Sequence, residues 1–238
     1  MNEEHRKLIK TARITGIWYL LLAISGIFGF MVFHSQIYVS GDPEQTLTNL
    51  INLEFLSRIR LLFEMIIVLS QALAAFWFYR LFKNFNAGQA WALGVWGTVN
   101  SIIIMISAIS MASAIQIANS TVHVFDDQVI LIDLIGNLIK HSWNIGGLFF
   151  GLWLIPMGYI VIISNRMPLW LGRTLIAGGL GYIISTLIYY MGISHSLLNV
   201  LTIPATVGEF WMIGYLLIYG VRPLNDLSAM TDEYSELD

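Results

Sequence analysis

Six long apolar segments dominate the sequence and constrain its fold more than any other feature. A helix needs about 20 mostly apolar residues to cross the hydrocarbon core of a bilayer. The segments run over about 14–33, 61–82, 91–118, 142–163, 174–193 and 204–221. Because lipid offers an open backbone no hydrogen-bond partners, such segments cross a membrane as helices. The sequence therefore predicts an all-α, polytopic transmembrane bundle with six spans.

The composition points to a bilayer as the natural solvent and excludes several classes of protein. Of the 238 residues, 57% are hydrophobic and 11% are charged, whereas soluble domains are about a quarter charged. The net charge of -3 does not provide the basic surface of a nucleic-acid binder. No cysteine is present, which excludes a disulfide scaffold and a thiol enzyme. We expect a multi-pass protein of a bacterial cytoplasmic membrane, surrounded by lipid and without a nucleic-acid partner.

Basic residues set the expected orientation, because they resist translocation across the membrane. With the N-terminus inside, only Arg58, Arg60 and Lys140 lie outside. The cytoplasmic set is then Arg6, Lys7, Lys10, Arg13, Arg80, Lys83, Arg166, Arg173 and Arg222. Both termini are therefore expected in the cytoplasm. The predicted organisation is a basic N-terminus over 1–13, a transmembrane domain over 14–222 and an acidic, disordered tail over 223–238.

Two outer loops carry further helix signals. Asp42 and Pro43 supply a capping acid and a proline for the first helical turn. They predict an outer helix that begins at Pro43 and bends into the second span. Between the third and fourth spans, Asp126 and Asp127 precede the apolar segment 129–139, which Asp133 and Asn137 break and which is too short to cross a membrane. This segment is predicted to form a separate interfacial helix on the outer leaflet.

Small residues are typical of close helix contacts in membranes. Gly147 and Gly151 form a G-x-x-x-G in the fourth span, and the glycines of 178–181 cluster in the fifth. Polar residues, among them Asn100 and Ser107, recur along the third span at roughly helical spacing. Two interpretations remain open for that span: helix packing, or a polar pathway along the helix.

Glu64 and Glu209 are the acids inside the predicted spans, and both are candidate binding residues. Counted at about 1.5 Å per residue from the arginine that closes each span, both fall in the outer third of the membrane. Ionisable groups there usually face a protein interior or a water-filled cavity. Each acid also has a structural interpretation. Glu64 follows Arg60 by four residues and can pair with it, and Glu209 follows Thr206 by three, which matches a capping box.

Further polar residues join these acids in one candidate ligand-binding set. Gln71 lies on the helix face of Glu64, two turns deeper, and His141 opens the fourth span. The set is Arg60, Glu64, Gln71, Asn100, His141, Asn144 and Glu209. A mixed cluster of histidine and carboxylate can also bind zinc, although no H-E-x-x-H or comparable spacing occurs. The candidate metal ligands are His141, His195, Glu64 and Glu209.

Several plain motifs, taken in their order and spacing, carry a family resemblance. They include residues 12–16 leading into 19–21, the outer turn at 41–43, residues 58–64, and then 150–151, 156–159, 167–172 and 178–182. Glu209 and the stretch 211–220 complete the pattern. Over about 12–222 the chain resembles a family of bacterial membrane proteins catalogued as domain of unknown function 4386. The resemblance implies an integral membrane protein of six to seven helices, with no established activity and no catalytic residue to transfer.

Three functional hypotheses follow. The chain has no P-loop, Rossmann fingerprint or G-x-S-x-G elbow, so no cofactor is expected and an enzyme is not favoured. The first hypothesis is a binding or sensory protein whose outward-facing polar pocket holds a small ligand, lipid headgroup or ion. The second is a small transporter that uses Gln71, Asn100 and Ser107 as its path inward. The third is a membrane-embedded, metal-dependent hydrolase. The sequence leaves the oligomeric state open.

Overall fold

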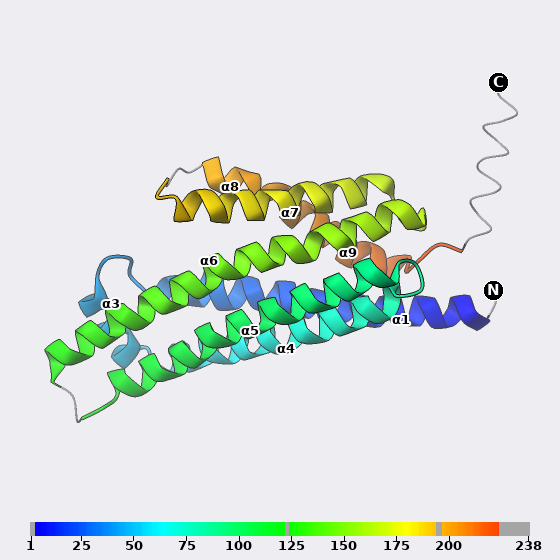
Figure 1. The fold of residues 1–238 in the computed structure, drawn as a ribbon. Helices are drawn as coiled ribbons and strands as arrows, with labels where there is room; N and C mark the ends of the chain where they lie inside the picture. Colours follow the sequence, from blue (N-terminus) through cyan, green and yellow to red (C-terminus); the bar gives the residue numbers. More distant parts are fainter. Residues whose placement is uncertain (1–2, 122–123, 194–196, 224–238) are drawn as a thin grey trace, which may run out of the picture. The chain divides into compact units, whose positions relative to one another are not determined.

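The computed structural model describes residues 3–121, 124–193 and 197–223, and they form helices joined by turns (Figure 1). The elements are α1 (Glu3–Gly26), η1 (Ile27–His34), α2 (Ser35–Ile37), α3 (Pro43–Asn52), α4 (Glu54–Phe82), α5 (Ala87–Ala118), α6 (Phe125–Ser164), α7 (Leu169–Tyr190), α8 (Leu197–Leu201) and α9 (Ile203–Ile218). No strand occurs in these three ranges, so the all-α prediction is confirmed. The predicted tail lies, from residue 224 on, outside the described residues.

Five helical stretches in the described part of the chain are long and apolar enough to cross a membrane. They are Glu3–Ile37, Glu54–Phe82, Ala87–Ala118, Phe125–Ser164 and Leu169–Tyr190, and they match the first five predicted spans. The sixth predicted span corresponds to α9, an apolar helix of 16 residues. Such a helix is about 24 Å long, somewhat shorter than a hydrocarbon core of about 30 Å. The count of six spans and the cytoplasmic position of the termini stay predictions.

The chain divides into two compact units, and the long helices contribute to both. Unit 1 consists of Met1–Tyr19, Leu73–Gly97 and Leu148–Asp238. Unit 2 consists of Leu20–Ala72 and Thr98–Gly147. Unit 2 therefore contains η1, α2 and α3 with the first part of α4, whereas unit 1 contains α7, α8 and α9. A single domain over 14–222 stays a prediction.

The outer helix after the first span begins where the sequence predicts it. Asp42 is the N-cap of α3 and accepts a hydrogen bond from the backbone N–H of Gln45 at 2.9 Å, with Pro43 in the first turn. The carboxylate thus satisfies one of the amide groups that a helix start leaves unpaired. α4 begins two residues after α3 ends, so the predicted bend into the second span lies at Leu53.

The prediction of a separate interfacial helix between the third and fourth spans is wrong. α6 is one helix of 40 residues, and residues 129–139 belong to its first turns. Asp133 and Asn137 do not break it, because they lie one turn apart on an exposed face, where Asn137 donates a hydrogen bond to Asp133. Ile132 and Ile139 lie on another face and are buried. An uninterrupted apolar face therefore carries the helix directly into the fourth span.

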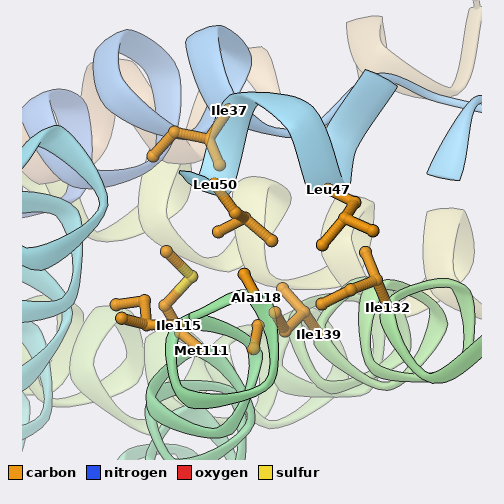
Figure 2. Close-up of a cluster of buried hydrophobic side chains, with 9 residues drawn as sticks. Ile37, Leu47, Leu50, Met111, Ile115, Ala118, Ile132 and Ile139 are labelled. Atoms are coloured by element: carbon orange, nitrogen blue, oxygen red, sulfur yellow. The ribbon is translucent and has the colours of Figure 1, made fainter. Parts of the chain in front are cut away.

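A cluster of buried apolar side chains in unit 2 joins α3 to α5 and α6 (Figure 2). Its members are Ile37, Leu47, Leu50, Met111, Ala114, Ile115, Ala118, Ile132 and Ile139. Leu47 and Leu50 come from α3 and cover the residues that α5 and α6 contribute. Tyr38 and Trp143 pack against the same cluster. This packing holds the two aromatic residues in place beside the candidate site.

Glycines let three helices of unit 1 approach to backbone distance. α6 and α7 meet at two pairs seven residues apart, where an added Cβ would lie within 2.7 Å of the facing carbonyl oxygen: Gly151 with Gly179, and Gly158 with Gly172. A Cβ on Gly178 would lie 2.3 Å from the backbone of Ala205 in α9. The packing interpretation of these glycines is supported, since no larger residue fits there without a shift of backbone.

Candidate functional site

Arg60 and Glu64 form a buried ion pair near the start of α4. Arg60 Nη1 lies 3.1 Å from Glu64 Oε2, and the two side chains are 1% and 2% exposed. A second pair in the same helix, Arg58 with Glu54, has the same four-residue spacing, but its side chains are 62% and 40% exposed. Spacing alone predicts the two pairs equally. Burial distinguishes them, because two desolvated charges depend on each other far more than two hydrated ones.

The other carboxylate oxygen of Glu64 is held from two further helices. Ser107 in α5 donates its hydroxyl hydrogen to Glu64 Oε1. The indole N–H of Trp143 in α6 lies 3.3 Å from the same oxygen and 3.1 Å from Ser107 Oγ, and donates to both. Three helices of unit 2 therefore meet at one carboxylate. Ser107 supports the ion pair directly, which favours a role for it beyond helix packing.

Aromatic rings enclose the ion pair on the side of η1 and α2. The guanidinium carbon of Arg60 lies 5.7 Å from the ring centroid of Tyr38, a cation–π contact. Tyr38 stacks on His34 at 4.8 Å, and His34 stacks on Phe30 at 4.7 Å. Phe30 contacts the ring of Trp143 at 4.4 Å. The series of ring contacts thus ends at Trp143, the residue that donates a hydrogen bond to the carboxylate of Glu64. Together these rings surround the ion pair within unit 2.

We call Arg60, Glu64, Ser107, Trp143, Tyr38 and His34 the Arg60–Glu64 cluster. Its polar atoms have more hydrogen-bonding capacity than the described residues satisfy. Buried atoms without a hydrogen-bond partner among those residues are Arg60 Nε and Nη1, Glu64 Oε2, Tyr38 Oη and His34 Nδ1. Arg60 Nη1 and Glu64 Oε2 lie at ion-pair distance, but their angles are not those of a hydrogen bond. Since buried polar atoms nearly always have partners, the cluster suits a polar molecule that offers both donors and acceptors.

Gln71 and Asn100 lie one heptad further along the same two helices. Across α4 and α5, Ser101 donates to the backbone carbonyl of Val68 at 2.7 Å. Together with the contact from α5 to Glu64, this bond shows that α4 and α5 run antiparallel in a fixed register. Seven residues beyond that contact on each helix, the register places Gln71 opposite Asn100.

This deeper level is polar and enclosed. Gln71 is 0% exposed and Asn100 2%. Neither amide atom of Gln71 has a hydrogen-bond partner within the described part of the chain, nor does Oδ1 of Asn100. Ile67 and Ile104, both buried, occupy the level between these amides and Glu64. Two polar levels therefore lie along α4 and α5, with an apolar layer between them.

Glu209 lies in unit 1 and has different surroundings. α9 begins three residues before Thr206, so Thr206 lies inside the helix and the capping interpretation of Glu209 is wrong. Instead, Glu209 Oε1 accepts a hydrogen bond from the hydroxyl of Tyr19 in α1 at 2.9 Å. No Lys, Arg or His of the described ranges forms an ion pair with Glu209.

The structure thus assembles part of the predicted set. It joins Arg60 to Glu64 and places the amides deeper in the same unit. His141 and Asn144 lie in α6, where His141 is exposed, and the neighbouring residue that bonds Glu64 is Trp143. Glu209 belongs to the other unit, so one pocket shared by the two acids stays a prediction. Of the candidate set, unit 2 therefore contains Arg60, Glu64, Gln71, Asn100, His141 and Asn144, and unit 1 contains Glu209.

Sequence reasoning missed His34, Tyr38 and Trp143 as site residues. The four-residue spacing of Phe30, His34 and Tyr38 was an available signal, because it places three rings on one helical face. The predicted metal ligand His195 lies outside the described residues. Within the described ranges, no group of three or more His, Cys, Asp or Glu residues can hold a metal ion.

A family comparison agrees with this architecture. A family model described as "Domain of unknown function (DUF4386)" matches residues 14–220. The chain belongs to this family. No curated protein and no solved structure gives a significant match. The family match and the apolar helices identify an integral membrane protein of the DUF4386 family.

Proposed function

We propose that this DUF4386 protein binds a small zwitterionic molecule at the Arg60–Glu64 cluster, as a membrane-embedded binding or sensory protein. The observation that supports the proposal is the buried ion pair, in which Arg60 Nε and Nη1 and Glu64 Oε2 have no hydrogen-bond partner in the described part of the chain. We place the cluster on the outer side of a bacterial cytoplasmic membrane, in agreement with the excess of basic residues at the opposite helix ends.

The atoms of the cluster indicate what the ligand carries. Arg60 Nε and Nη1 are donors that suit a phosphate or carboxylate oxygen. Glu64 Oε2 is an acceptor that suits an ammonium or hydroxyl group. Because the ion pair has no net charge, a ligand with opposite charges of its own complements it better than a simple anion or cation. Phosphoethanolamine, free or as a lipid headgroup, has this arrangement of phosphate and ammonium.

The cluster is suited to binding more than to proton transfer. Glu64 already interacts with the guanidinium of Arg60, the hydroxyl of Ser107 and the indole N–H of Trp143. These three partners from three helices fix the carboxylate in one position, as a preformed binding site requires.

Native mass spectrometry of the purified full chain tests the proposal with three probes: phosphatidylethanolamine, phosphatidylglycerol and free phosphoethanolamine. The test variant is Arg60→Gln with Glu64→Gln, which removes both charges and so leaves none uncompensated. The control is Arg58→Gln with Glu54→Gln, the exposed pair of the same helix. Binding to phosphatidylethanolamine should weaken about tenfold in the test variant, which corresponds to the loss of one charge-assisted hydrogen bond, and should stay unchanged in the control.

Comparison with the other two probes, phosphatidylglycerol and free phosphoethanolamine, identifies the source of the ligand. Preference for phosphatidylethanolamine over phosphatidylglycerol supports zwitterion recognition, and equal binding of the free headgroup supports a soluble ligand. Wild-type affinity of the Arg60→Gln, Glu64→Gln protein for all three probes would contradict the proposal.

Transport is a second candidate function, and one observation favours it. Gln71 and Asn100 form a buried polar level deeper along the helices that hold Glu64, which a transported molecule needs beyond its first binding site. Uptake of labelled phosphoethanolamine into liposomes that contain the protein tests this function. Transport predicts uptake that Gln71→Leu abolishes while binding at the Arg60–Glu64 cluster persists. Absence of uptake by the wild-type protein would leave binding as the function.

A further inference from the structure

Glu209 is an acid in an otherwise apolar helix, and its surroundings differ from those of a structural ion pair. The neighbouring Val207 and Phe210 are 53% and 50% exposed, as expected for side chains that face lipid. A charged carboxylate in such surroundings is costly and needs a partner or a water-filled cavity. The identity of that partner therefore decides what Glu209 can do.

The partner that the structure provides is neutral. Tyr19 donates its hydroxyl hydrogen to Glu209 Oε1 at 2.9 Å, and Tyr182 of α7 lies close enough to interact electrostatically with the carboxylate. Tyr19 of α1 and Tyr182 of α7 are therefore titratable neighbours of Glu209. The ion pairs of the described residues do not include Glu209. Among the described residues, no cation thus offsets the charge that the acid carries when it ionises.

The position of Tyr19 is fixed by packing. Its side chain is 0% exposed. Its ring meets Phe78 at 5.4 Å and Trp153 at 5.2 Å, both edge to face, and these two rings contact each other at 5.7 Å. Such aromatic contacts favour one ring orientation, so the hydroxyl group is held toward Glu209 whether or not the acid is charged.

We propose that Glu209 is a reversible proton-binding site, and that its ligand is the proton itself. In the ionised state the carboxylate accepts the hydroxyl hydrogen of Tyr19. When a proton from water binds, the group becomes a neutral carboxylic acid, and Tyr19 keeps its own hydrogen and donates it to the remaining carbonyl oxygen. The same hydrogen bond therefore serves both states, and the charge of the site changes by one. The proposal for Glu209 does not rest on ligand binding at the Arg60–Glu64 cluster.

A membrane-soluble carbodiimide tests this inference, because it adds to carboxyl groups in their protonated form. The full chain in lipid vesicles is treated between about pH 5 and about pH 9, a range above the ordinary titration of a hydrated Glu. Mass spectrometry then quantifies the adducts at Glu209 and Glu64. We expect labelling at Glu209 that falls as the pH rises, and labelling at Glu64 that stays at least about tenfold lower, because that carboxylate is paired with Arg60 and accepts hydrogen bonds from Ser107 and Trp143. Equal labelling of the two acids, or labelling of Glu209 that does not depend on pH, would overturn the proposal.

Infrared spectroscopy provides a second measurement that does not depend on the reagent. The difference spectrum between acid and alkaline pH should contain the carbonyl band of a protonated carboxylic acid. Glu209→Gln should remove this band, while Glu64→Gln keeps it. If Glu209→Gln does not fold, Glu209→Asp keeps a carboxyl group but shortens its reach to Tyr19, and the band should then appear over a different pH range. A band that persists unchanged in these Glu209 variants would also overturn the proposal.

Discussion

Glu64 and Glu209 show how two acids in apolar helices can be accommodated in opposite ways. Glu64 lies against a guanidinium and accepts hydrogen bonds from two further helices. Glu209 accepts one hydrogen bond from a tyrosine, and the described residues offer it no cation. The first arrangement keeps a charge and compensates it inside the protein. The second leaves the charge to be removed by a proton.

An acid inside a span therefore does not by itself indicate one function. A compensated carboxylate is a fixed acceptor around which a binding site can form. An uncompensated one changes its charge with its surroundings. Under the two proposals, the same residue type therefore serves ligand recognition in unit 2 and proton binding in unit 1, and the neighbours of each acid decide between them.

The largest expected effect comes from breaking the compensated pair. Arg60→Gln leaves Glu64 buried and unpaired, which costs about 3–5 kcal/mol of stability. Arg58→Gln removes the exposed arginine of the same helix and costs less than about 1 kcal/mol. Thermal unfolding followed by tryptophan fluorescence in one detergent compares the two variants. Adding Glu64→Gln to Arg60→Gln should restore most of the lost stability. Equal losses for the two arginine variants would contradict the burial of the pair.

A smaller effect is expected from moving α9 relative to α7. In Gly178→Ala the new Cβ would lie 2.3 Å from the backbone of Ala205, one turn before Glu209. Overpacking of this kind costs about 1–3 kcal/mol, and the pH dependence of carbodiimide labelling at Glu209 should change. Gly214→Ala is the control, since nothing lies within 4 Å of a Cβ there. Phosphatidylethanolamine binding should be the same in both variants. A loss of binding in Gly178→Ala would contradict the claim that Glu209 and the Arg60–Glu64 cluster act separately.

The smallest effects come from removing one hydroxyl group beside each acid. Tyr19→Phe and Ser107→Ala should each cost about 1.5 kcal/mol, the low end of the net contribution of a hydrogen bond to a charged group. Their chemical consequences should differ. Tyr19→Phe should alter the labelling of Glu209, whereas Ser107→Ala should leave Glu64 unlabelled because Arg60 and Trp143 remain. Tyr219→Phe, at a residue that is 67% exposed, is the control for both variants. Labelling of Glu64 in Ser107→Ala would contradict the assignment of Glu64 to a stable ion pair with Arg60.

Much of the fold was predictable because it depends on local patterns. Apolar runs of helical length predicted the spans, and Asp42 with Pro43 predicted the start of α3. The error at α6 has a physical reason. Asp133 and Asn137 suggested a break, but on an exposed face such residues bond each other and leave the helix intact. Nothing local distinguishes that outcome from a helix end.

The candidate site was predictable only where its contacts are local. Arg60 and Glu64 are one turn apart, so their pairing can be read from spacing. Ser107, Trp143 and Tyr19 reach their acids from 43, 79 and 190 residues away in sequence. A single sequence contains no signal for such contacts. For the same reason, spacing suggested that Glu209 caps a helix, whereas the fold joins it to a tyrosine of the first helix.

An experimental map of the full chain in lipid nanodiscs that contain phosphatidylethanolamine tests the binding site most directly. The decisive region is the volume around Arg60 Nε and Nη1, Tyr38 Oη and Glu64 Oε2. We predict density that does not belong to the protein within hydrogen-bonding distance of these atoms, present in the wild type and absent in the Arg60→Gln, Glu64→Gln variant. A map in which protein side chains satisfy all four atoms, with no further density beside them, would contradict the proposed binding site.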